Sequence, residues 1–91
     1  MLDLVMTRKF EHDLRIMSKR GYNLGTLKAV IKRLCAEEEL EPKYRVHKLI
    51  GKYKGLYECH VEPDWLLIYG IDNRQCILVA AHTGTHSDLF K

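Results

Sequence analysis

Apolar residues recur along this chain with two different periods, helical in the first third and strand-like in the last half. After Thr7, apolar residues follow at three- and four-residue spacing until Gly21, and a second such run begins after Asn23 and ends at Cys35. The spacing predicts one helix over 7–21 and a second over 23–35, with Thr7 and Asn23 as N-caps. Because only a very short segment joins the two runs, we expect the two helices to form an antiparallel pair.

The remaining apolar segments have strand character. Residues 1–5 alternate and predict a short first strand, whereas 56–61, 65–70 and 75–82 predict three strands joined by short turns. The tail 83–90 starts with a glycine turn and ends in an apolar pair that can dock as a short helix or hook. The predicted fold class is α+β: an N-terminal strand, an antiparallel helix pair and a three-stranded antiparallel meander, with the helices on one face and the other face free.

Length and composition limit the possibilities further. The 91 residues are enough for a single domain over 1–91 with a thin core. No window approaches the roughly 18 apolar residues of a membrane helix, and the first ten residues include an acid where a secretion signal has bases, so we expect a cytoplasmic protein. The three cysteines are odd in number and form no C-x-x-C pair, which predicts reduced thiols and no disulfide.

Charge is distributed unevenly although the net charge is only +3. An acidic run over 37–41 is followed by residues 43–54, called the basic strip below, which hold five bases, two tyrosines, His47 and no acid. A basic segment with interleaved aromatic rings favours binding to a phosphate backbone with bases that can stack. The alternative is a solvated charged surface without a ligand.

Histidine is the candidate residue for chemistry, since four of the five histidines follow residue 46. If Val61 faces the helices, strand alternation turns His60 and Glu62 to the free face, with Asp64 just across the Pro63 turn. The same alternation places Cys59 in the core, which argues against a cysteine nucleophile.

Metal binding is not predicted. His82 and His86 have helical ligand spacing, but Gly84 between them favours a turn, and cysteine pairs are absent. The remaining possibility is metal-free acid–base chemistry on RNA, in which the 2′-hydroxyl is the nucleophile, histidines transfer protons, and Lys or Arg neutralises the phosphate.

Three ordered blocks resemble the motifs of YafQ-type toxins in the RelE/ParE superfamily: "HKLIGKYKG" over 47–55, "HVEPDWLLIY" over 60–69 and "TGTHSDLF" over 83–90. The resemblance implies a RelE-like fold and a bacterial endoribonuclease that cleaves mRNA in the ribosomal A site without a cofactor. It also implies a cognate antitoxin that neutralises the toxin in a hetero-oligomer. We expect the toxin alone to be a monomer, because no long apolar stripe remains once the two helices cover the sheet.

The resemblance also implies roles for individual residues. The catalytic group would be His47, His60, Asp64 and His86. His86 would be the general acid, His60 or Asp64 would help remove the 2′-proton, and His47 would aid charge or substrate placement. RNA-binding positions would be Arg45, Lys48, Lys52, Lys54, Trp65, His82 and Phe90. The alternative for Trp65 is a place in the hairpin core, and the alternative for Phe90 is docking of the C-terminus. The chain departs from the family at Tyr57, Val79 and His82, where related toxins commonly have arginine; a protonated His82 and the lysines would then have to compensate.

Two other functions are compatible with the sequence. One is a ParE-like toxin that acts on a protein such as gyrase, and the other is a catalytically weak toxin homologue that serves as an antitoxin-binding co-repressor. Transcripts cleaved after induction would indicate the ribonuclease, whereas intact RNA with blocked replication would indicate the gyrase-type toxin.

Overall fold

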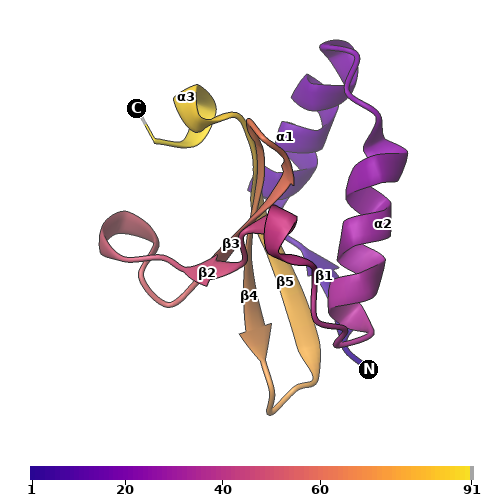
Figure 1. The fold of residues 1–91 in the computed structure, drawn as a ribbon, viewed down its shortest axis with the longest axis vertical. Helices are drawn as coiled ribbons and strands as arrows, with labels where there is room; N and C mark the ends of the chain where they lie inside the picture. Colours follow the sequence, from indigo (N-terminus) through magenta and orange to yellow (C-terminus); the bar gives the residue numbers. More distant parts are fainter. Residues whose placement is uncertain (91) are drawn as a thin grey trace.

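The computed structural model describes residues 1–90, which form a five-stranded sheet with two long helices and a short C-terminal helix (Figure 1). The strands are β1 (Asp3–Met6), β2 (His47–Lys48), β3 (Tyr57–Glu62), β4 (Trp65–Asp72) and β5 (Ile77–Gly84). The helices are α1 (Arg8–Lys19), α2 (Leu24–Cys35) and α3 (His86–Leu89), and Pro42–Tyr44 and Gly51–Tyr53 form single 3₁₀ turns. No helix within these residues is long and apolar enough to cross a membrane.

The strand order is β1-β5-β4-β3-β2. Strands β3, β4 and β5 form the predicted antiparallel meander, which confirms the α+β class. The sheet is wider than predicted, because β1 pairs in parallel with β5 and the two-residue β2 pairs antiparallel with β3. Strand β2 lies inside the basic strip, and its two residues are too few for a periodic pattern to predict a strand.

The two helices begin at the predicted caps. The Thr7 side chain accepts a hydrogen bond from the Phe10 backbone N–H at 3.0 Å, and the Asn23 side chain accepts one from Gly25 at 2.9 Å. Figure 1 shows α1 and α2 side by side against one face of the sheet, where their apolar residues join the inward residues of β3, β4 and β5 in the main core. Cys59 lies in this core, as predicted.

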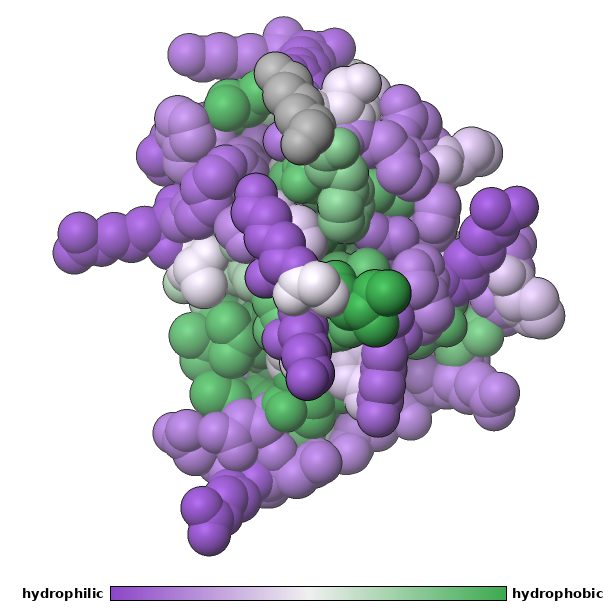
Figure 2. Space-filling view, turned by 90° about the vertical axis from the view of Figure 1, so that its left-hand side faces the viewer, coloured by the Kyte–Doolittle hydropathy of each residue, from purple (hydrophilic) through white to green (hydrophobic). Residues whose placement is uncertain are grey.

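The opposite face is less free than predicted. A second apolar cluster lies there, made by residues from β4 and β5 and from the segments that cross them: Tyr53, Leu66, Ile68, Ala81 and Leu89. The loop before β3 and helix α3 therefore cover part of this face. Figure 2 views the molecule from this side and shows hydrophilic side chains with apolar patches between them.

Candidate active site

Strand β3 presents one imidazole and one carboxylate on the face that α1 and α2 do not cover. Glu58 and His60 are both buried, and His60 Nε2 lies 3.6 Å from Glu58 Oε1. His60 Nδ1 lies 3.1 Å from the Pro63 carbonyl oxygen, which can only accept, so this nitrogen carries the proton. The other nitrogen is thereby directed at Glu58.

His47 approaches the same carboxylate from β2. Its Nε2 lies 3.3 Å from Glu58 Oε1, and its Nδ1 donates to the Arg45 carbonyl oxygen at 2.6 Å. The pairing of His47 with Glu58 across β2 and β3 explains the contact, because directly paired residues project to the same face. Glu58 therefore lies between two imidazoles with its side chain only 5% exposed.

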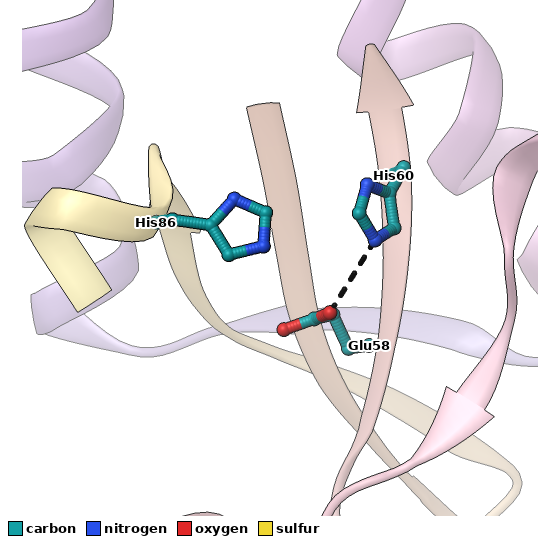
Figure 3. A group of neighbouring side chains, drawn as sticks. All are labelled: Glu58, His60 and His86. Atoms are coloured by element: carbon teal, nitrogen blue, oxygen red, sulfur yellow. Dashed lines mark ion pairs between the residues drawn. The ribbon is translucent and has the colours of Figure 1, made fainter. Parts of the chain in front are cut away.

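His86 enters from α3 and faces His60 across a ring-centroid distance of 5.7 Å. Figure 3 shows His60 and Glu58 on β3, with the His86 ring directed toward them from the short helix. His86 Nδ1 donates to Asp64 Oδ1 at 2.7 Å, and the His86 backbone N–H donates to the same oxygen at 3.0 Å. Both hydrogen bonds hold the pKa of Asp64 below its usual value, and the bond from the His86 backbone has the larger effect. Asp64 thus stays ionised and fixes His86 with its Nε2 free.

The four residues that the family resemblance assigned to catalysis thus lie together at one end of the sheet, from β2, β3, the β3–β4 turn and α3. Glu58 was not predicted, although it has the same strand parity as His60. Glu62 was expected beside His60 instead. A shift in strand register between His60 and Glu62 pairs Glu62 with Trp65, whereas Glu58 contacts both His47 and His60.

Trp65 lies in the hairpin core, which was the alternative to base stacking that the sequence left open. Trp65 is 1% exposed and lies in the main core on the helix-covered side. Its ring meets Tyr22 edge-on at 5.0 Å, and its Nε1 donates to Thr83 Oγ1 at 2.9 Å. Phe90 is the available aromatic ring: it is 45% exposed, packs edge-on against Tyr53, and has its centroid 6.3 Å from that of His86.

His82 is poorly suited to supply the positive charge expected of it. Burial lowers its pKa, more than the nearby Asp13 carboxylate raises it, which disfavours the charged form of the imidazole. Its ring lies 5.1 Å from that of Tyr53, and its Nδ1 is buried without a hydrogen-bond partner. The imidazole is therefore a poor substitute for an arginine.

The lysine and arginine side chains of the basic strip are exposed but project in different directions. Lys52 lies over the Tyr53 ring, on the same face as the second apolar cluster. Lys48 lies over the Tyr57 ring instead, and Tyr57 packs against the main core, so Lys48 projects away from His47. Arg45, in a left-handed conformation, and Lys54 are exposed beside β2.

Comparison with known proteins identifies the family. The family model described as "Bacterial toxin of type II toxin-antitoxin system, YafQ" matches residues 2–91. The chain belongs to the YafQ toxin family. The "mRNA interferase toxin YafQ" of Escherichia coli strain K12 is 34% identical over 89 residues, which is 97% of this chain and 95% of that protein.

Solved structures of bacterial toxins agree with this fold over nearly the whole chain. A metal-bound toxin from Helicobacter pylori is 41% identical with a TM-score of 0.92, covering 99% of this chain and 100% of that chain. The YafQ chain of the E. coli DinJ–YafQ complex is 33% identical with a TM-score of 0.89, covering all of both chains. The predicted RelE-like architecture is therefore confirmed.

Proposed function

We propose that this YafQ-family toxin is an mRNA interferase that cleaves mRNA in the ribosomal A site through the RNA 2′-hydroxyl. The observation that carries the proposal is the pair of imidazoles, His60 and His86, facing each other across 5.7 Å, each beside a carboxylate. One imidazole can remove a proton on one side of a phosphate while the other delivers a proton on the far side.

His60 is the general base in this proposal. Its Nδ1 proton is committed to the Pro63 carbonyl, so its Nε2 is the atom that can accept the 2′-hydroxyl proton. The imidazolium formed would lie 3.6 Å from Glu58 Oε1, and a buried carboxylate at that distance stabilises it. The 2′-oxygen then attacks the adjacent phosphorus.

His86 is the general acid. Asp64 holds its Nδ1, so Nε2 of the protonated ring is the atom that can deliver a proton to the departing 5′-oxygen. Asp64 is therefore a positioning residue in this proposal, and His60 is the base. His47 shares Glu58 and lies at the solvent edge, where it can contact the phosphate or the next nucleotide.

Substrate binding would rest on charge and stacking next to these histidines. Lys52, Lys54 and Arg45 supply exposed positive charge along the loop beside β2, and Phe90 offers an exposed ring close to His86. Stacking of a base on such a ring contributes about 1–3 kcal/mol. In this arrangement the mRNA backbone passes between the basic strip and α3.

The same cluster also fits a metal ion. One ligand atom from each of Glu58, His60 and His86 lies within 4.8 Å of the others, and imidazole with carboxylate suits zinc or copper. A related toxin from H. pylori is described as metal-bound. We propose that catalysis is metal-independent and that a divalent ion bound here would block both proton transfers. Cleavage should therefore persist in EDTA and decrease when copper or zinc is added.

The biological setting follows from the family. As a toxin of a type II system, the chain would act in the cytoplasm as a monomer and be neutralised there by a cognate antitoxin in a hetero-oligomer. The E. coli relative is seen in complex with DinJ, which gives a precedent for such an assembly.

Cleavage of a ribosome-bound message tests the proposal directly. His86→Ala should abolish both the cut in a translated reporter mRNA and the growth arrest after induction. His12→Ala is the matched control, because His12 is an exposed histidine on α1, which covers the opposite face. Full growth arrest by His86→Ala, with intact RNA and blocked replication, would instead indicate a gyrase-type toxin.

A further inference from the structure

Helix α3, which carries His86, is a single turn of four residues. A helix this short is not stable in isolation, because too few hydrogen bonds form to offset the cost of nucleation. The position of His86 must therefore depend on contacts that fix α3 from outside. Leu89 packs into the second apolar cluster, and its carbonyl accepts a hydrogen bond from the Tyr53 hydroxyl at 3.2 Å.

The strongest polar contact to α3 comes from Arg20, 68 residues earlier in the chain. Arg20 Nη1 donates to Asp88 Oδ2 at 2.7 Å, and Nη2 donates to Asp88 Oδ1 at 3.1 Å. This is the two-pronged geometry in which a guanidinium binds a carboxylate most specifically. The bond holds the pKa of Asp88 far below its usual value, so the carboxylate remains ionised.

Asp88, held by Arg20, also fixes the first turn of α3 through hydrogen bonds with Thr85. Its Oδ2 also accepts the Thr85 backbone N–H at 2.8 Å, while Thr85 Oγ1 accepts the Asp88 backbone N–H at 3.3 Å. These two bonds form a capping box around the residue next to His86. Gly84 leaves the space that this needs, since a Cβ there would lie 3.0 Å from Asp88 Oδ2.

Arg20 is itself well anchored. It is the C-cap residue of α1, its backbone N–H bonds to the Ile16 carbonyl at 3.1 Å, and its guanidinium contacts Met17 Sδ at 3.7 Å. Helix α1 packs against β5, the strand that leads into α3. The ion pair therefore connects the end of α1 rigidly to the start of α3.

We propose that Arg20 is a positioning residue for His86, acting through Asp88 and the capping box of α3. His86 is then fixed from two sides. Asp64 orients its ring and backbone N–H, and the Arg20–Asp88 pair holds the turn from which the side chain projects. This inference rests on the proposed role of His86 as general acid.

Substitution of Arg20 tests the inference in a protein that should still fold, because an exposed ion pair contributes little to global stability. Arg20→Gln should lower kcat for ribosome-dependent mRNA cleavage by about tenfold to 100-fold with little change in KM, since small displacements of a reacting group have effects of this size. Arg20→Lys should restore part of the loss. Lys19→Gln is the control, because it removes the same charge from an exposed neighbouring position.

A second readout does not depend on activity. The ¹⁵N NMR signals of the His86 ring report its hydrogen bond to Asp64, and they should change in Arg20→Gln and in Asp88→Asn but not in Lys19→Gln. A wild-type kcat with unchanged His86 signals in Arg20→Gln would overturn the inference, as would an equal loss in Lys19→Gln. If His86→Ala cleaves normally, the proposed function fails, whereas the NMR comparison still decides whether Arg20 positions His86.

Discussion

Replacement of Trp65 distinguishes a core residue from a base-stacking residue. Trp65 is 1% exposed, and a tryptophan side chain buries roughly 200 Å² of surface, which corresponds to about 5 kcal/mol at ~25 cal/mol per Å². Measured Trp→Ala changes in cores reach about 3–5 kcal/mol. A chain of 91 residues has a total unfolding free energy of about 5–14 kcal/mol. Trp65→Ala should therefore lose a large part of its stability.

Trp65→Phe is the more informative variant, because it keeps most of the packing. It removes the hydrogen bond from Nε1 to Thr83 Oγ1, while Thr83 still donates to the Leu66 carbonyl oxygen. The lost bond should cost about 1–2 kcal/mol. Urea unfolding followed by circular dichroism should show this decrease, while kcat and KM for mRNA cleavage, measured well below the unfolding midpoint, should match those of the wild type.

Phe90→Ala is the matched comparison on the exposed side. Phe90 is 45% exposed, so its removal should change the unfolding midpoint little but raise KM through the lost stacking surface. If Trp65→Phe instead kept wild-type stability and raised KM, the indole would contact RNA, and the assignment of Trp65 to the core would be refuted.

Three further predictions concern single side chains. Glu58→Gln should lower kcat by about tenfold or more, because the neutral amide no longer stabilises the imidazolium beside it; a wild-type kcat would remove Glu58 from the mechanism. Burial raises the pKa of the Cys59 thiol to about 12, so a thiol reagent should label the exposed Cys76 in the native protein and Cys59 only after unfolding. The pKa of Asp88 is far lower in the folded protein than its value of ~3.9 in the unfolded chain, so the ionised carboxylate stabilises the folded state at pH values above ~3.9. The difference in unfolding free energy between the wild type and Asp88→Asn should therefore be constant above about pH 5 and shrink as the pH falls further. Parallel urea midpoints for the two proteins at all pH values would contradict the Asp88 prediction.

The elements themselves could be predicted because their signals are local. Thr7 and Asn23 satisfy backbone N–H groups that any helix starting there leaves free, and both cap in the structure. Strand alternation likewise requires Cys59 and His60 to face opposite sides, and Cys59 is in the core while His60 contacts Glu58. Both arguments need only a few neighbouring residues.

The candidate site could be predicted only in part from the sequence. The family resemblance named His47, His60, Asp64 and His86, which the structure brings together. The expected strand alternation, however, placed Glu62 rather than Glu58 beside His60. The register shift at that point pairs Glu62 with Trp65, which lies in the main core together with Leu67 and Tyr69 of the same strand. A bulge depends on how two strands pair, and the local pattern of one strand does not specify it.

The sequence by itself determined the two helices, the three central strands and the family, because caps, periodicity and ordered motifs are all written within short segments. Only the tertiary structure decided that β1 lies beside β5, that Glu58 joins His47 to His60, and that Arg20 holds α3. These contacts join residues from separate elements that are far apart in the sequence, for example 68 positions for Arg20 and Asp88. Their formation depends on how the packed helices and the sheet bring distant segments together.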